Sequence, residues 1–243
     1  MASTLRIVTW NCNGALRKKW QSLEPFHADL HVIQECENPA TTKDAAYQAW
    51  ASNHLWVGSN KNKGLGVFAR DGVTLEAVAL DTEPHRLFLP CRVDGAPLLA
   101  SWTLKADSSI PSYIGQLWGV LQHVKGFLDH PHALLAGDLN SNAQWDNRDP
   151  RCNHSNVVAT LAEMGLYSLY HRNRGIGHGG EPDPTFYLHR KTTKPYHIDY
   201  VFAGPGWTLE HIQVGTAEDW LEISDHMPVS ATTSRRVTIQ SKF

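Results

Sequence analysis

Short apolar runs, each closed by polar or turn-forming residues, dominate the hydrophobic pattern of the chain. Runs of this length predict strands rather than helices. We expect strands over residues 5–11, 29–35, 64–70, 73–80, 86–93, 98–104, 132–136, 185–189, 197–203, 208–214 and 229–233. Helical periodicity predicts four helices, over residues 15–23, 42–50, 112–128 and 156–164, and Gly165 is the expected C-cap of the last one.

Strands therefore outnumber helices, and many neighbouring strands are joined by hairpin-length turns such as Asp94-Gly95. This pattern predicts an α+β fold in which a few helices cover mostly antiparallel sheets, and it argues against a doubly wound parallel sheet. Asn13-Gly14 after the first strand is not a glycine-rich nucleotide loop. No linker-like stretch interrupts the 243 residues, so we expect a single domain over residues 1–243.

Composition limits which partners the protein can bind and in which cellular compartment it is expected. The net charge of −2 argues against tight non-specific binding of duplex nucleic acid, although it leaves a nuclease possible. No signal peptide or membrane-spanning run is present, which predicts a cytoplasmic protein without a membrane partner. The four cysteines are widely separated, so we expect reduced thiols and neither disulfides nor a zinc site.

Acids and amides gather at the ends of the predicted strands. The segments that carry them read IVTWNCNG, HVIQE, ALLAGDLN, HIDYVF and ISDHMP. Side chains alternate along a strand, so Asp138 and Asn140 are expected to share one face, and His197 and Asp199 another. Any single strand-end aspartate is more often a turn or cap residue, and only the set as a whole indicates a site.

The clustered acids favour a metal. Four of them, Glu35, Asp138, Asp199 and Asp225, have apolar neighbours and no matching set of lysines or arginines. Partly buried carboxylates are costly unless paired, so we expect them to converge on a divalent cation, with His226 pairing one of them. Oxygen ligands favour Mg²⁺, with Mn²⁺ or Ca²⁺ as alternatives.

These segments resemble the motifs of the endonuclease/exonuclease/phosphatase superfamily, which includes exonuclease III, abasic-site endonucleases and pancreatic deoxyribonuclease. The residues that carry the resemblance are Trp10-Asn11 with Asn13-Gly14, Gln34-Glu35, Gly137-Asp138-Leu139-Asn140, Ile198-Asp199-Tyr200 and Ser224-Asp225-His226. The resemblance implies a four-layer α/β/β/α sandwich. It also implies a monomeric Mg²⁺-dependent phosphodiester hydrolase, a nuclease acting on DNA rather than RNA.

The resemblance also assigns roles to residues. It makes Glu35 the main metal ligand, with Asn11 and Asp225 as further ligands. Asp138 would orient or deprotonate the attacking water, and Asn140 would donate to the phosphate or hold a neighbouring residue. Asp199 would fix His226, which is either an imidazolium that stabilises charge or a neutral base.

Several positions depart from the family pattern or leave alternatives open. Trp102 stands where relatives carry a phosphate-contacting His or Tyr, and Tyr113 could supply the hydroxyl instead. His197 stands where many relatives carry Arg, and it either faces substrate or makes a structural hydrogen bond. Asn13 often has an Asp counterpart, and Trp145, like Trp102, either stacks on a base or packs in the core.

Two cationic segments, residues 171–180 and 189–197, either contact phosphate or form solvated faces. Two other readings of the whole chain remain: a phosphoesterase acting on a small molecule or lipid headgroup, and a non-catalytic binding module. The complete acid set argues against the binding module, because unused clustered carboxylates cost stability.

Overall fold

The strands form two six-stranded sheets and one two-stranded sheet in the computed structural model, which describes residues 4–106, 111–148 and 152–236. The first sheet has the order β13 (Trp207–Val214), β14 (Val229–Arg235), β1 (Thr4–Asn11), β2 (Leu30–Cys36), β4 (Lys63–Ala69), β3 (His54–Asn60). The second has the order β5 (Leu75–Ala77), β6 (Phe88–Val93), β7 (Ala96–Trp102), β8 (Leu134–Asp138), β12 (Asp199–Ala203), β9 (Tyr167–Ser168). The short sheet pairs β10 (Phe186–Tyr187) with β11 (Pro195–Tyr196).

Antiparallel pairing predominates in both large sheets. The parallel neighbours are β1 with β2 and β7 with β8, and each of these pairs lies in the middle of its sheet. All other neighbouring strands of the two sheets are antiparallel. The expectation of mostly antiparallel sheets is confirmed.

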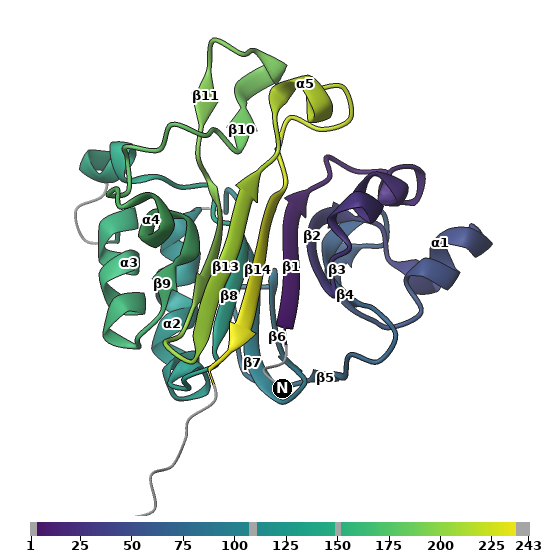
Figure 1. The fold of residues 1–243 in the computed structure, drawn as a ribbon, viewed down its shortest axis with the longest axis horizontal. Coiled ribbons are helices and arrows are strands. Elements are labelled where there is room, and N and C mark those ends of the chain that lie inside the picture. The colour runs from purple at the N-terminus through teal and green to yellow at the C-terminus, as the bar shows by residue number, and fades with distance from the viewer. Residues whose placement is uncertain (1–3, 107–110, 149–151, 237–243) are drawn as a thin grey trace, which may run out of the picture.

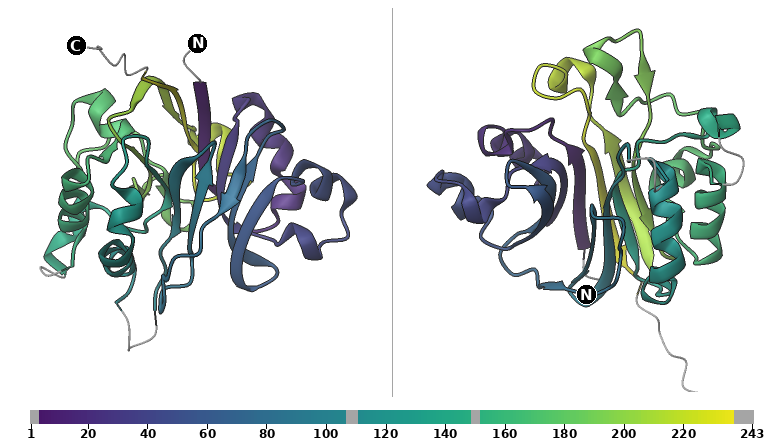
Figure 2. Two further views of the ribbon diagram at one scale, coloured as in Figure 1. Left: turned by 90° about the horizontal axis from the view of Figure 1, so that it is seen from below. Right: turned by 180° about the vertical axis from the view of Figure 1, so that it is seen from behind.

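Helices cover the outer face of each sheet, so the molecule has four layers (Figures 1 and 2). The second sheet is covered by α2 (Ile114–Leu128), α3 (His154–Glu163) and α4 (Leu169–Arg174). The first is covered by the 3₁₀ helices η1 (Leu16–Lys18) and η2 (Trp20–Phe26) and by α1 (Ala45–Trp50). Shorter elements are η3 (Pro39–Thr41), η4 (Ala143–Arg148), η5 (Leu188–Arg190) and α5 (Ala217–Trp220). The predicted α/β/β/α sandwich is confirmed.

Alternation along the strands builds the apolar layers of the sandwich. In β7, Leu98, Ala100 and Trp102 belong to the cluster between the two sheets, whereas Leu99 packs in the cluster under α2 and α3. A third cluster lies between the first sheet and η1, η2 and α1. Both faces of the central strands are therefore buried, which explains why these strands read as nearly continuous apolar runs, whereas β13 and β14 alternate between buried and more exposed positions.

One predicted helix is wrong in type. Residues 15–23 form no α-helix but two 3₁₀ segments separated at Lys19, whose φ of −131° is not helical. The Lys19 ammonium donates to the backbone carbonyls of Cys12 and Ile223, which holds the chain close to the sheet at the break. Pro25 inside η2 also removes a backbone donor that an α-helix would use.

Other elements escaped prediction. Strand β3 is half-exposed along its length and has no clean alternation of buried and exposed positions. Helix α4 has only six residues, although its ends carry ordinary signals: Ser168 caps the first turn and Gly175 follows in the left-handed conformation, with φ of +65°. Among the described helices, none is long and apolar enough to cross a membrane.

Candidate active site

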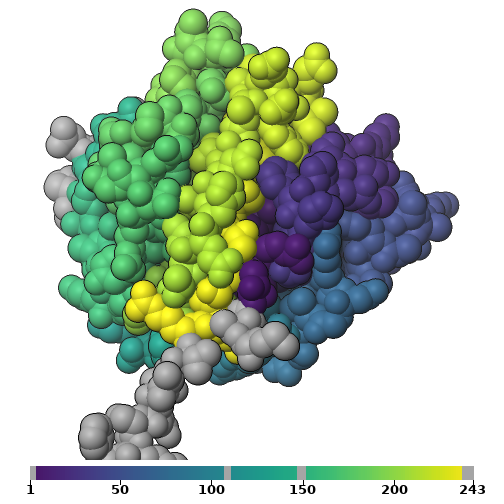
Figure 3. All heavy atoms as spheres, viewed as in Figure 1, coloured from purple at the N-terminus to yellow at the C-terminus, as the bar shows by residue number. Residues whose placement is uncertain are grey.

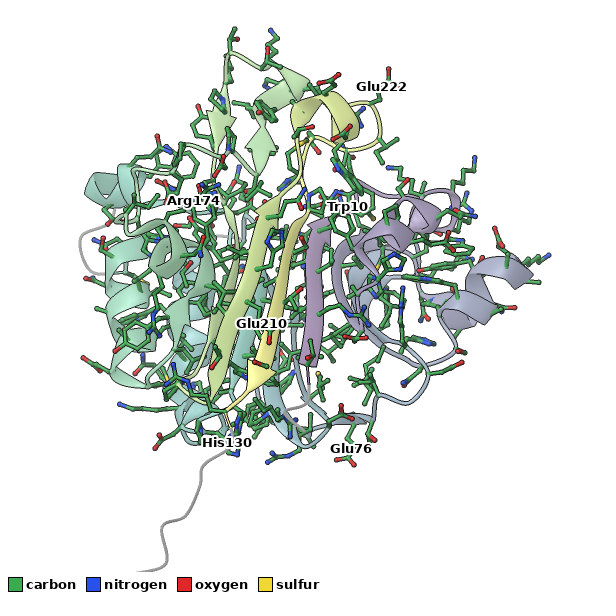
Figure 4. All side chains as sticks on the ribbon, viewed as in Figure 1. Trp10, Glu76, His130, Arg174, Glu210 and Glu222 are labelled. Atoms are coloured by element: carbon green, nitrogen blue, oxygen red, sulfur yellow. The ribbon has the colours of Figure 1, made fainter. Side chains whose placement is uncertain are left out.

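The predicted site residues come from both sheets and meet at one end of the sandwich. Asn11 ends β1, Glu35 lies near the end of the adjacent β2, and His226 precedes β14. Asp138 ends β8 and pairs directly with Asp199, the first residue of β12. Trp10, labelled in Figure 4, marks this end of the sandwich, and Glu76 and His130 are labelled at the opposite end.

Asp138 is the centre of a hydrogen-bond network and is fully buried. Its Oδ2 accepts from the side-chain amides of Asn11 at 3.0 Å and Asn140 at 2.9 Å, and its Oδ1 accepts from the backbone of Asn140 at 2.8 Å. Gly137 allows this arrangement, because a Cβ there would lie 1.8 Å from the carbonyl oxygen of Ser101. The network fixes the orientation of the Asp138 carboxylate.

His226 lies between the two buried aspartates. Its Nδ1 is 2.9 Å from Oδ2 of Asp199, and its Nε2 is 4.0 Å from Oδ2 of Asp138. The backbone around it is fixed as well, because the Trp10 indole donates to the His226 carbonyl at 2.9 Å. Asp199 therefore sets the orientation of the imidazole, and Nε2 remains directed toward the Asp138 side of the site.

The electrostatics of the cluster favour a charged histidine. Burial by itself would lower the pKa of His226, but the carboxylates of Asp199 and Asp138 raise that pKa to about 9. Burial and the charge of Asp199 raise the pKa of Asp138 to about 7. Near neutral pH the imidazole of His226 therefore keeps its proton, and the carboxyl group of Asp138 can accept or release a proton.

Glu35 lies beside this network and already attracts a cation. A bulge where β2 pairs with β4 places Glu35 in the left-handed conformation, with φ of +62°. Its Oε2 lies 2.9 Å from the ammonium of Lys63, and its Oε1 is 3.5 Å from Nδ2 of Asn11. The carboxylate oxygens of Glu35 are of the kind that a hard divalent cation prefers as ligands.

Strained backbone supports the assignment of this region as a functional site. Asn13, Glu35 and Asn140 all have positive φ values, between 44° and 62°. Such residues cost conformational free energy and tend to cluster at functional sites. Here all three lie within the predicted motifs.

Asp225 and Asn13 form a separate pair at the rim. The amide of Asn13 donates to Oδ1 of Asp225 at 2.8 Å. This bond leaves the role of Asp225 open, and its assignment as a third metal ligand stays a prediction.

Trp102 packs in the core instead of lining the site surface. Its ring is 2% exposed and lies between the two sheets, with the ammonium of Lys63 5.7 Å from the ring centre. A ring so enclosed offers no face to a base, which favours the core-packing interpretation of Trp102. Trp145, in contrast, is half-buried and lies 5.1 Å from the ring of Tyr196.

The predicted shared face of His197 and Asp199 is wrong. His197 packs against Tyr170 and Tyr200 and donates from Nδ1 to the carbonyl of Asp183, whereas Asp199 faces His226. Strand alternation fails here because β12 begins only at Asp199. Of the two open interpretations, the structural hydrogen bond describes His197, which is 3% exposed.

Residues 171–180 also differ from the expected cationic surface loop. Two of their histidines turn inward: His171 and His178 stack at 3.6 Å with ring planes 9° apart. Nε2 of His171 contacts Glu181 at 2.8 Å, and His178 contacts Nε2 of His154 at 2.9 Å. The sequence signal for this cluster is the number of histidines between residues 154 and 197.

This histidine cluster is a hydrogen-bonded support and a poor metal site, although its ligand atoms lie within 4.8 Å of one another. A metal must lie in the plane of each imidazole that binds it, and one ion cannot lie in two parallel stacked planes. The Glu181 carboxylate is already occupied, because it accepts from His171, the backbone of Gly179 and the amide of Asn142.

Glu181 gives a testable pH dependence of stability. Burial would raise its pKa, but donation from His171 and Gly179 lowers it from 4.5 to about 2. The carboxylate therefore stabilises the fold fully above pH 4.5, and this contribution is lost as the pH falls toward 2. Urea unfolding at several pH values between 4.5 and 2 should show that the free energy of unfolding falls less for Glu181→Gln than for the wild type. Equal slopes for the two proteins would contradict this role.

Two packed mixed sheets, with a buried acid, amide and histidine site at one end, define the class of the protein as a four-layer phosphoesterase sandwich. The sequence model of the endonuclease/exonuclease/phosphatase family matches residues 8–226. The chain therefore belongs to this family of nucleases and phosphatases. A comparison with curated protein sequences finds no match.

Solved structures with the same fold include three informative neighbours. An AP endonuclease from Archaeoglobus fulgidus matches with a TM-score of 0.69 at 18% identity, covering 93% of this chain and 98% of that one. The 3′ phosphatase NExo from Neisseria, bound to a product DNA hairpin, matches with a TM-score of 0.71 at 20% identity, covering 93% and 98%. TDP2 from D. rerio, complexed with a single-strand DNA product, matches with a TM-score of 0.59 at 18% identity, covering 95% and 99%.

Proposed function

We propose that the protein is a Mg²⁺-dependent nuclease that hydrolyses phosphodiester bonds of DNA. The observation that carries the proposal is the convergence of Asp138, Asn140 and the His226–Asp199 pair beside Glu35. This set supplies a proton acceptor, which the Asn140 amide orients, and a cationic donor, next to a carboxylate suited to a metal.

The roles follow from the contacts. Glu35, together with Asn11 and Asp225, would hold the ion, which when bound would neutralise a phosphate oxygen and the leaving oxygen. Asn11 turns its nitrogen toward Glu35, so its amide must rotate by half a turn to offer an oxygen. Asp138 orients or deprotonates the attacking water. His226 donates from Nε2 to the phosphate, where negative charge grows in the transition state.

The surface next to His226 suits DNA as a substrate better than it suits a small phosphodiester. An aromatic row leads away from the imidazole: Phe186 lies 4.6 Å from His226, and Tyr196 joins Phe186 to Trp145. The segment that carries β10 and β11 rises with α5 above this end of the molecule (Figure 3). Its Arg190, Lys191 and Lys194 are exposed, which suits contact with a phosphate backbone. Two of the structural neighbours hold DNA products.

A panel of substrates tests the proposal. The purified protein is incubated with Mg²⁺ and single-stranded, duplex, abasic and mismatched DNA, RNA, a 3′-phosphorylated oligonucleotide and a chromogenic phosphodiester. We expect cleavage of at least one DNA substrate, abolished by EDTA. Hydrolysis of the chromogenic ester alone would instead favour the small-molecule alternative, which the net charge of −2 also suits.

The pH profile of kcat/KM should be bell-shaped. Asp138 acts as an acceptor, so activity should rise as the pH passes its pKa of about 7 and the carboxyl ionises. His226 acts as a cation, so activity should fall as the pH passes its pKa of about 9 and the proton is lost. Asp199→Asn removes a carboxylate that raises the pKa of His226, and the basic limb should move to lower pH. A basic limb unchanged in this variant would argue against Asp199 as the partner that keeps His226 charged.

A further inference from the structure

A cleft opens directly beside Asn140, on the side of the site away from Glu35. It is lined by the start of α2, by residues 140–146 and by the start of α3. Asn140, Ser141 and Asn142 form one wall, and the rings of Tyr113 and Trp145 also line it. A group attached to a phosphate bound in the site next to Asn140 would therefore enter this cleft.

The cleft suits an uncharged ring and not a phosphate. Its ionisable lining groups, among the described residues, are Asp146, His154, Cys152 and Tyr113, and none is a lysine or arginine. The Asp146 carboxylate accepts from the backbone amides of His154 and Ser155 at the start of α3, and burial lowers the pKa of His154 to about 4. A partly aromatic wall without a lysine or arginine among its described residues suits the face of a nucleobase better than a phosphate.

Tyr113 is the unusual feature of this cleft. Ser112 to Gly115 form a tight turn, closed by a 3.2 Å bond from the Gly115 amide to the Ser112 carbonyl. Tyr113 occupies its second position with φ of 53° and ψ of −126°, the conformation of a type II′ turn that favours glycine. A bulky residue there costs conformational free energy, and the fold alone would be served better by glycine.

Packing of the Tyr113 side chain does not compensate for the conformational strain of its backbone. Tyr113 is 42% exposed, and among the described residues only Tyr167 is an equally exposed large hydrophobic residue. The backbone of Tyr113 is linked to the catalytic network, because its amide donates to Leu104 at 2.7 Å and the carbonyl of neighbouring Thr103 accepts from Asn140. The backbone from which the ring projects is thus anchored to the segment that also holds Asn140.

We propose that Tyr113, with Trp145, forms a subsite for an unpaired nucleobase next to the cleaved phosphate. The inference rests on the proposed nuclease function and adds a substrate class to it: single-stranded or locally unpaired nucleic acid, since a paired and stacked base could not enter the cleft. Tyr113 is here a specificity-determining residue that contacts substrate without taking part in proton transfer.

The test measures dependence on individual bases. Labelled pentanucleotides, each lacking one base at a different position, are titrated by fluorescence anisotropy in the presence of Ca²⁺. For the wild type, removing the base at one position should weaken binding by about 5- to 100-fold, the range for loss of one base–aromatic stack. In Tyr113→Gly, binding of the intact oligonucleotide should weaken by a similar factor, and removing that base should then have little further effect.

Stability distinguishes this role from a structural one. Tyr113→Gly should keep or raise the thermal midpoint, because glycine adopts the turn without strain. Tyr113→Phe should retain the base dependence, and Tyr167→Ala, which removes the other equally exposed tyrosine, should leave it unchanged. The proposal is overturned if binding by Tyr113→Gly depends on the base as strongly as binding by the wild type does. It is also overturned if the variant has a lower thermal midpoint and no other change. Base-dependent binding without cleavage in Mg²⁺ would contradict the nuclease proposal alone, because anisotropy does not require turnover.

Discussion

Replacing His226 with glutamine should lower kcat by about 10²- to 10⁴-fold, the contribution typical of a positioned acid–base or charge-stabilising group. Glutamine keeps much of the side-chain volume but carries no positive charge between Asp199 and Asp138. The loss should therefore appear in kcat, since the charge interacts most strongly with the transition state. The measurement is steady-state kinetics on the best DNA substrate from the panel.

Folding must be monitored in the same experiment. His226→Gln leaves two buried carboxylates without their cationic partner, so some loss of thermal stability is expected. Circular dichroism and the thermal midpoint report whether the variant is folded at the assay temperature. His31→Gln is a matched control, because His31 is also buried, at 4% exposed, and lies on β2 outside the site. A folded His226→Gln variant with near-normal kcat would refute the role proposed for this residue.

Replacing Glu35 with glutamine should weaken Mn²⁺ binding by about 100-fold or more, because even changes to groups that only support a metal ligand cost about 10- to 100-fold. Isothermal titration with Mn²⁺ measures this loss directly and does not depend on turnover. Mg²⁺ should raise the thermal midpoint of the wild type, since an ion that binds only the folded state stabilises it, and this increase should disappear in the variant.

Two further variants sharpen the metal experiment. Glu37→Gln changes a neighbouring acid that is 6% exposed and pairs with Arg17, and it should bind Mn²⁺ as the wild type does. Asp225→Asn tests the third predicted ligand. A marked loss of Mn²⁺ affinity would assign Asp225 to the metal. An unchanged affinity would mean that Asp225 only accepts the hydrogen bond from Asn13. Wild-type Mn²⁺ affinity in Glu35→Gln would exclude Glu35 as the main ligand.

The motif residues could be recognised from sequence because their chemistry is local. Gly137-Asp138-Leu139-Asn140 and Ser224-Asp225-His226 combine residue types that an apolar strand end rarely needs for folding alone. The layered α+β fold could be predicted for a similar reason, since the many short apolar runs joined by hairpin turns leave few other architectures.

Failures of prediction occurred where the backbone departs from regular periodicity. Residues 15–23 break at Lys19 into two 3₁₀ segments, and the late start of β12 sends His197 and Asp199 to different sides. Neither departure has a signature in a single sequence, because periodicity assumes an unbroken helix or strand.

The sequence by itself determined the candidate residues and the reaction type that they suit, because residue identity fixes charge, proton affinity and ligand preference. Only the tertiary structure decided how these residues are arranged. It joined Asp138 to Asp199 across two antiparallel strands, set His226 between them, and buried Trp102 and His197 away from the surface. These outcomes depend on contacts between residues tens to hundreds of positions apart, whose geometry is set by the packing of the two sheets.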